Sequence, residues 1–355
     1  MKLKILVQLI FTMALVGSPT SSLAHQDELN IVVEVKGEVH LKRAVWPKYQ
    51  FAEIGNLLRP SDRLRLGRKA SVKVLCNNLL VWNVPSGRES LVSSGCQSTA
   101  NPAIKFDNNP RGPSRSPQDS TIPYIISPRD TMLLDSKVIL RWNPVKGAKY
   151  YIVCIEGEKV NWAIQVTKPE VAYRGEPPLK PGIYWITVLA DNGESSTSDV
   201  PVEFRILNQE TALQVQSAVQ QLKQQSLDPE ATALALAHLY RSYGLKAGAI
   251  EVLEKVINSG SQISAVYQLL GDLYKQTGLI SFAKNQYLKA LKLSEAESNL
   301  EGKALAQVSL GEIEESRDQV IHWLQAAQNN YLVLGDKEQV EKLRQQLAKL
   351  QGRLP

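Results

Sequence analysis

The stretch that decides the fold is YQLLGDLYKQTGLISFAKNQYLKA, residues 267–290. Its pattern occurs once before, in ALALAHLYRSYGLKAGAIEVLEKV, residues 233–256, so the two copies are 34 residues apart. A fixed period of this length is typical of solenoid proteins, in which each repeat is a small helical unit that packs on its neighbours. The sequence therefore predicts stacked pairs of helices in this region.

Small and aromatic residues recur at positions where two paired helices would meet. Gly271 and Ala283 are small enough to let the helices of one pair cross closely, while Tyr274 and Tyr287 would fill the gaps between turns. Gly278 is expected to end the first helix of the pair, because glycine readily adopts the left-handed conformation found after a helix.

At this spacing, Leu270-Gly271, Tyr274, Gly278 and Ala283 resemble the tetratricopeptide repeat family. The resemblance covers residues 228–355 and implies a helical solenoid. We expect the solenoid to consist of two regular repeats, at 230–263 and 264–297, and a degenerate third repeat at 298–333. A capping helix at 335–351 is expected to follow. Residues 208–227 are predicted to form a connecting helix.

In the tetratricopeptide family the first helix of each pair lines a concave groove that binds a protein or peptide. Counted in this register, the groove positions are Leu234, His238, Arg241, Gln268, Asp272, Lys275, Glu312 and Glu315. The Lys and Asn clamp with which some family members bind a C-terminal carboxylate is absent at these positions. The alternative interpretation is that they are simply solvated, and that His238 is an ordinary exposed helix residue.

Residues 31–97 alternate apolar and polar side chains with period two, which predicts a small β domain with apolar side chains on one face of each strand. Gly37-Glu38-Val39, Gly55-Asn56-Leu57-Leu58 and Ser61-Asp62-Arg63-Leu64 resemble the FecR-type periplasmic domain. In that family the domain is often the outer part of a membrane-spanning regulator.

Residues 98–121 are rich in Pro, Asn, Ser and Arg and are predicted to be a linker. Residues 122–207 return to short strands, which indicates a β-sandwich. Here Trp142-Asn143-Pro144-Val145 and Pro181-Gly182-Ile183-Tyr184 resemble a fibronectin type III domain. The predicted fold class is thus multidomain β plus α: a small β domain, a β-sandwich and a C-terminal α-helical solenoid.

Residues 1–24 have the three parts of a secretory signal peptide: Lys2 and Lys4, an apolar core from Ile5 to Val16, and small residues before Ala24. Cleavage after Ala24 is expected, and the alternative is that the segment is retained as a membrane anchor. No later stretch is apolar and long enough to span a bilayer. The mature protein is therefore expected in the periplasm or outside the cell.

The chain contains 3 cysteines. Cys76 and Cys96 lie in the first β domain, and because an exported protein meets oxidising conditions they are candidates for a disulfide. The alternative is two buried thiols. Cys154 is predicted to be a buried thiol of the β-sandwich core.

The formal net charge is +6. Arg63, Arg65 and Arg68 form part of a basic cluster in the first β domain, and they could contact an anion or merely form a solvated strand face. Export argues against a nucleic-acid partner, as does the lack of aromatic residues for base stacking beside these arginines in the sequence.

The sequence contains no H-E-x-x-H, no G-x-S-x-G, no P-loop and no glycine-rich dinucleotide-binding turn, so no catalytic residue, cofactor or metal is predicted. Our first hypothesis is a non-enzymatic cell-envelope scaffold that binds a protein or peptide through the repeat groove. The alternatives are a FecR-like sensory or regulatory component, and an envelope protein that binds or hydrolyses carbohydrate. The sequence does not indicate the oligomeric state.

Overall fold

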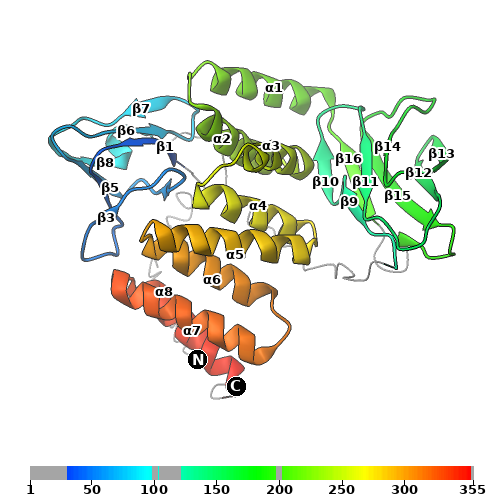
Figure 1. Cartoon of the computed structure of the whole chain (residues 1–355). Helices are drawn as coiled ribbons and strands as arrows, with labels where there is room; N and C mark the ends of the chain where they lie inside the picture. Colours follow the sequence, from blue (N-terminus) through cyan, green and yellow to red (C-terminus); the bar gives the residue numbers. More distant parts are fainter. Residues whose placement is uncertain (1–29, 98–102, 104–120, 197–201, 353–355) are drawn as a thin grey trace, which may run out of the picture.

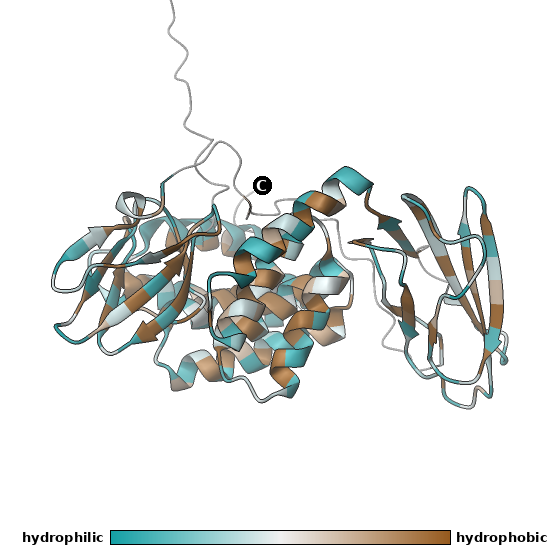
Figure 2. Ribbon diagram, turned by 90° about the horizontal axis from the view of Figure 1, so that it is seen from above, coloured by the Kyte–Doolittle hydropathy of each residue, from teal (hydrophilic) through white to brown (hydrophobic). Residues whose placement is uncertain are grey.

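The computed structural model describes residues 30–97, 103, 121–196 and 202–352. The predicted signal peptide and almost all of the predicted linker lie outside the described residues. Two β parts are followed by a C-terminal array of helices. The helices lie in the middle of the molecule, with one β part on either side (Figures 1 and 2).

The first β part consists of two four-stranded sheets with the orders β4-β1-β6-β7 and β3-β2-β5-β8. All their pairings are antiparallel. The strands are β1 (Asn30–Lys36), β2 (Val39–Lys42), β3 (Gln50–Phe51), β4 (Leu57–Leu58), β5 (Arg63–Leu66), β6 (Ser71–Leu75), β7 (Val81–Asn83) and β8 (Glu89–Leu91).

Strand β1 is apolar on both faces, which differs from the predicted one-sided pattern. Val32 packs in the core shared by the two sheets, whereas Ile31 and Val33 join the core of the helices. The register with β6 shifts between Val32 and Glu34, which is a β-bulge. Strand β1 is buried on both faces because the helices cover the outer face of its sheet.

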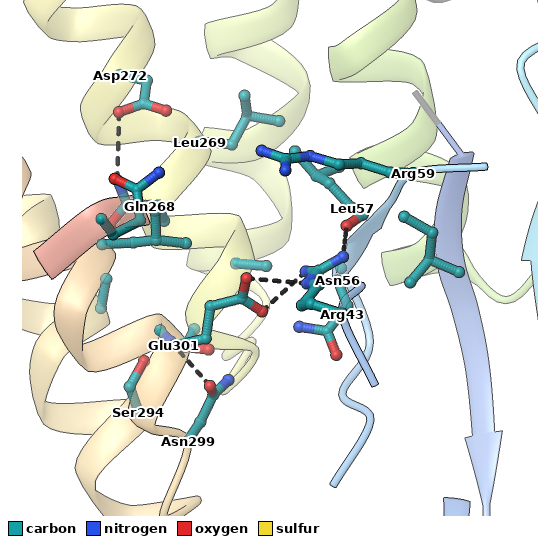
Figure 3. A pocket seen from close by; sticks show the side chains of 18 of the residues that line it. Arg43, Asn56, Leu57, Arg59, Gln268, Leu269, Asp272, Ser294, Asn299 and Glu301 are labelled. Carbon is teal, nitrogen blue, oxygen red and sulfur yellow. Dashed lines mark hydrogen bonds and ion pairs between the residues drawn. The ribbon is translucent and has the colours of Figure 1, made fainter. Parts of the chain in front are cut away.

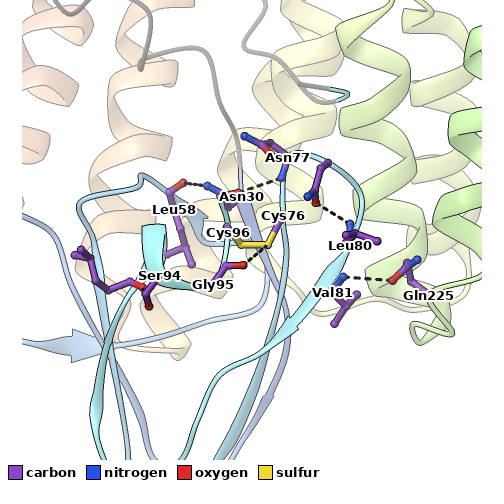
Figure 4. The surroundings of a disulfide bond; sticks show 12 residues. Asn30, Leu58, Cys76, Asn77, Leu80, Val81, Ser94, Gly95, Cys96 and Gln225 are labelled. Carbon is purple, nitrogen blue, oxygen red and sulfur yellow. Dashed lines mark hydrogen bonds between the residues drawn. A yellow bond between two sulfur atoms is a disulfide. The ribbon is translucent and has the colours of Figure 1, made fainter. Parts of the chain in front are cut away.

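Cys76 and Cys96 form a disulfide inside this β part (Figure 4). Both residues belong to the core shared by the two sheets. The short 3-10 helix Val92–Ser94 follows β8. The bond joins the residue directly after β6 to Cys96, just beyond this helix, so it ties the last segment of the β part to its centre.

The second β part has a five-stranded sheet, β10-β16-β15-β12-β13, and a three-stranded sheet, β14-β11-β9. Residues from both sheets form one core, so the sheets face each other. Within β12 that core receives Tyr151, Val153 and Ile155. Cys154 points the other way and is only partly buried, so the prediction of a core thiol was wrong. The strands are β9 (Ile125–Ser127), β10 (Thr131–Leu133), β11 (Ile139–Trp142), β12 (Tyr151–Gly157), β13 (Val160–Val166), β14 (Glu170–Ala172), β15 (Gly182–Ala190) and β16 (Val202–Ile206).

The C-terminal array packs each helix on the next in chain order. None of the described helices is long and apolar enough to cross a membrane. The helices are α1 (Gln209–Lys223), α2 (Pro229–Ser242), α3 (Lys246–Asn258), α4 (Ser264–Gln276), α5 (Ile280–Ala296), α6 (Leu300–Ile313), α7 (Arg317–Leu334) and α8 (Lys337–Leu350).

The repeated residues lie where α4 crosses α5. A Cβ atom at Gly271 would come within 2.5 Å of the ring of Tyr287, so only glycine allows this approach. Gly278 follows α4 with φ of +77°. Its amide donates to the carbonyl of Lys275, and the amide of Leu279 donates to that of Tyr274, which caps the end of the helix.

The second β part is attached to the turns of the helical array. The backbone amide of Met132 donates to the carbonyl of Gly244 at 2.9 Å, and the Thr131 hydroxyl accepts from the amide of Ala247 at 3.0 Å. Farther along, the Arg129 side chain donates to the carbonyl of Thr277 at 2.6 Å. Strand β10 is thereby held at the end of α2, and Arg129 just before this strand is held at the end of α4.

The first β part sits on the other side of the array, and Gly55 is its closest approach. This residue has φ of +89°, and a Cβ atom there would lie 2.2 Å from the Cβ of Ala265 and 3.1 Å from a methyl group of Leu234. The loop before β4 therefore rests directly on α2 and α4.

Replacing Gly55 by Ala should destabilise this docking. The substitution adds a backbone penalty of roughly 1–2 kcal/mol at positive φ and a steric clash of about 1–3 kcal/mol. Gly87 is a matched control, because its φ is +75° and nothing lies within 4 Å of its absent Cβ. In thermal denaturation, Gly55→Ala should lower the Tm clearly more than Gly87→Ala. Equal losses would contradict the tight docking.

Candidate functional site: a cavity between the first β part and the helices

A cavity of about 600 Å³ lies between the first β part and the helical array (Figure 3). The residues around β4 and the β2–β3 connection form one wall, and α2, α4, α6 and α8 supply most of the other. The β-side lining includes Arg43, Asn56, Leu57 and Arg59; the helical lining includes His238, Arg241, Gln268, Asp272, Ser294, Glu301 and Lys342.

Arg43 closes one side of the cavity and links the two walls. Its guanidinium makes a two-point contact with Glu301 on α6, at 2.8 and 3.1 Å, and reaches Asp62 at 2.6 Å. It also donates to the carbonyl of Leu57 at 2.5 Å. Burial alone would lower the pKa of Arg43, but the carboxylates of Glu301 and Asp62 hold it above its ordinary value. The arginine therefore stays charged.

A second contact joins the same walls at the C-terminal end of the array. The indole of Trp46 is buried and donates to the carboxylate of Asp336 at 3.2 Å. Beside it, the ring of Pro47 lies so close to Gly335 that a Cβ atom there would come within 2.5 Å. The β2–β3 connection is thus held against the start of α8.

Three of the residues that line the cavity each have a buried polar atom with no hydrogen-bond partner: Arg241 Nε, Gln268 Oε1 and Ser294 Oγ. Gln268 uses its amide nitrogen to donate to Ser309 at 2.9 Å, which leaves its carbonyl oxygen free. A buried polar group without a partner carries a desolvation cost of about 1–3 kcal/mol. These atoms lie behind the surface of the cavity, and they supply two donors and an acceptor to a polar ligand once their side chains turn toward it.

The charged groups near these atoms are only partly neutralised. Asp272 accepts from the hydroxyl of Tyr287 at 2.9 Å and lies 3.9 Å from Arg241. Burial raises the pKa of Asp272, against the lowering effect of the Arg241 cation. Burial, and then Arg241, lower the pKa of His238 to about 3, so its imidazole is neutral near pH 7.

The structure brings together four of the eight predicted groove residues, His238, Arg241, Gln268 and Asp272, as lining of this cavity. Leu234 is fully buried, underneath Gly55. His238 is 5% exposed, so the alternative of an ordinary exposed helix residue was wrong.

The other predicted groove residues lie away from the cavity. Lys275 and Glu312 pair with each other at 2.6 Å between α4 and α6. Glu315 is exposed in the connection from α6 to α7.

Sequence reasoning missed the wall that the β part contributes. Arg43, Asn56 and Leu57 had no assigned role, because nothing in their spacing shows that the β part folds onto the helices. The one available signal was strand β1, whose consecutive apolar residues Ile31, Val32 and Val33 indicate burial on both faces.

The three arginines predicted as an anionic contact lie away from this cavity. Arg63 and Arg65 are exposed on β5, and Arg68 is exposed in the turn after it. The guanidinium of Arg65 lies 4.2 Å from the centre of the Tyr49 ring. Folding thus brings Tyr49 beside these arginines, although no aromatic residue stands next to them in the sequence.

Two partly buried carboxylates, Glu53 of the first β part and Glu297 after α5, are close enough for the charge of Glu297 to act on Glu53. Burial, and then the neighbouring Glu297 carboxylate, raise the pKa of Glu53 to about 7. Burial also raises the pKa of Glu297, which accepts a hydrogen bond from Ser264 at 2.9 Å. Within the described ranges, no group of three His, Cys, Asp or Glu residues could hold a metal ion.

No family model matches the chain, and no curated protein matches it either. The extracellular domain of a putative hybrid two-component system from B. thetaiotaomicron is similar at 13% identity and a TM-score of 0.19, over 45% of this chain and 28% of that one. A beta-1,2-glucanase from Parabacteroides distasonis is similar at 10% identity and a TM-score of 0.21, over 82% and 51%. This chain thus spans less than two thirds of either structure. At these TM-scores neither similarity carries an argument about function.

Replacing Arg43 by Met should strongly destabilise the docked arrangement. The variant leaves the carboxylates of Asp62 and Glu301 buried without their cation, which costs about 3–5 kcal/mol. Arg63→Met is the control, because the Arg63–Glu89 pair is exposed and such pairs contribute at most about 1 kcal/mol. Urea denaturation measures both free energies of unfolding. A loss below that of the control would show that Arg43 does not hold the walls together.

Replacing Glu53 by Gln should remove a pH dependence of stability. Because folding raises the pKa of Glu53 from 4.5 to about 7, the folded protein holds this proton more tightly than the unfolded chain. Its stabilising contribution is therefore complete below about pH 4.5 and is lost as the pH rises to about 7. The Tm of Glu53→Gln should exceed that of the wild type increasingly over this range. Glu158→Gln, which changes an exposed turn residue, should show no such trend.

Proposed function

We propose that this chain is an exported, non-enzymatic adaptor that holds a protein or peptide partner in the cavity between its helices and its first β part. In this proposal the helices form a tetratricopeptide-type solenoid, and the two β parts are a FecR-like and a fibronectin type III-like module. The 34-residue period and the close contact of Gly271 with Tyr287 support the solenoid. The signal-like leader and the Cys76–Cys96 disulfide support export.

The observation that carries the proposal is the set of polar atoms without partners in the cavity. Once their buried side chains turn toward the cavity, Arg241 Nε and Ser294 Oγ can donate to a peptide carbonyl, and Gln268 Oε1 can accept from a peptide amide. The cavity volume of about 600 Å³ lies within the range of ligand pockets. An extended peptide has donors and acceptors along its length, so it offers partners to atoms of both kinds.

The docked β part restricts how a partner would enter. It covers Leu234, so the first predicted groove position is closed to a partner in this arrangement. The partner would instead contact α4, α6 and α8 together with the wall that holds Arg43 and Asn56. The first β part would then determine specificity as well as the helices.

Site-specific photo-crosslinking in the native host tests this function. A benzophenone amino acid replaces Leu305, which lines the cavity and is 44% exposed, or Leu332, which is 57% exposed on α7 outside the cavity lining. One discrete protein adduct should form from position 305 and not from position 332. It should weaken when Arg241→Ala and Gln268→Ala are added. Adducts of equal yield from both positions, or none from position 305, would refute the proposal.

A further inference from the structure

The outer face of the sheet β3-β2-β5-β8 gathers cations and aromatic rings away from the cavity. On neighbouring strands Lys42 lies directly opposite Arg63, and His40 lies opposite Arg65. Figure 1 labels β3, β5 and β8 of this sheet at the left of the first β part. Like charges placed directly opposite each other on paired strands destabilise a sheet. Folding therefore assembles a positively charged face at some cost in stability.

The aromatic rings lie among these cations. The ring of Phe51 stacks on His40 with centroids 5.0 Å apart, and Tyr49 meets His40 edge to face. Lys42 and Arg65 both lie over the ring of Tyr49, at 5.8 and 4.2 Å. Phe51 is 64% exposed, so its ring can still take a further contact.

A carboxylate neutralises only part of this charge. Glu89 on β8 pairs with Arg63 and accepts from the hydroxyl of Tyr49. The surrounding region is basic as well, because residues 30–97 contain 11 Lys and Arg against 5 Asp and Glu, a surplus of six positive charges. The helical residues 208–352 contain 14 against 16, so the chain's basic character belongs to the first β part.

A surface hollow of about 610 Å³ adjoins this face. Lys42 and Arg63 line it together with Ser61, Leu91 and Ser93. The two cations thus border both the flat aromatic face and the hollow, where hydroxyl groups are also available for hydrogen bonds.

We propose that this face binds an acidic polysaccharide. Phe51 stacks against the apolar face of a sugar ring, and Lys42, Arg63 and Arg65 pair with carboxylates along the polymer. The single exposed ring favours a polysaccharide over single-stranded nucleic acid, which stacks successive bases on several rings. Phe51 is also the one large apolar side chain exposed on these described strands, so the face lacks the apolar area expected for insertion into a membrane.

Binding of polygalacturonate to the purified full chain, measured by calorimetry, tests the proposal. The double variant Lys42→Gln/Arg65→Gln should bind at least about tenfold more weakly, because two charge-assisted contacts are lost. Phe51→Ala should weaken binding severalfold without changing the net charge. The matched control is Lys36→Gln/Lys73→Gln, which removes the same two charges from the other sheet and should bind as the wild type does.

Each alternative has its own outcome. Equal losses in the two double variants would show attraction by net charge alone and overturn the proposal. Tighter binding of oligo-dT or of phosphatidylglycerol vesicles than of polygalacturonate would also overturn it. Tm measurements verify that each variant is folded. Phe51→Ala is expected to fold because it replaces an exposed side chain, so it still tests the proposal if a double variant is unstable. This test is independent of the cavity, so it can fail without affecting the adaptor proposal.

Discussion

The guanidinium of Arg43 connects the first β part to the helices through groups that are far apart in the chain. It bridges Asp62 in its own β part and Glu301 on α6, and it is itself 8% exposed. Removing a charge from water is costly, and the two carboxylates with the Leu57 carbonyl offset that cost only when all are in place. A displaced β part would leave these charges without partners. The two ion pairs of Arg43 therefore select one geometry in which the first β part docks on the helices, and the cavity exists because of that geometry.

The apolar contacts around this ion pair supply most of the driving force for docking. Ile31, Val33, Leu75 and Leu79 of the first β part belong to the same buried cluster as the helices α2 to α6. Burial of apolar surface is not directional, so it brings the two parts together without choosing their orientation. Arg43, and the fit of Gly55 against Ala265, provide the orientation. On the other side of the array, the second β part adds a backbone hydrogen bond from Met132 at the turn after α2 and a side-chain hydrogen bond from Arg129 at the turn after α4.

Much of the fold follows from local patterns in the sequence. The period of 34 residues located the helices α2 to α5, because helix contacts within a repeat depend on residues close in the chain, such as Gly271 and Tyr287. The alternation of apolar residues located the strands for the same reason. The prediction for Cys154 was wrong because side chains alternate between the two faces of a strand. Val153 and Ile155 point into the core of the second β part, so Cys154 between them points to the outer face of β12. A strand periodicity shows which residues share a face but not which face is covered.

The sequence by itself determined the order of β and helical parts, the end of α4 at Gly278 and four of the residues that line the cavity. These features depend on the properties of single residues or on contacts a few positions away. Only the tertiary structure decided that the first β part folds onto the predicted groove, that Arg43 meets Glu301, and that Tyr49 lies beside Arg65. Arg43 and Glu301 are separated by 258 positions, and a local pattern holds no information on a pairing over that distance. Such contacts arise because apolar faces that each part leaves uncovered must be buried against one another.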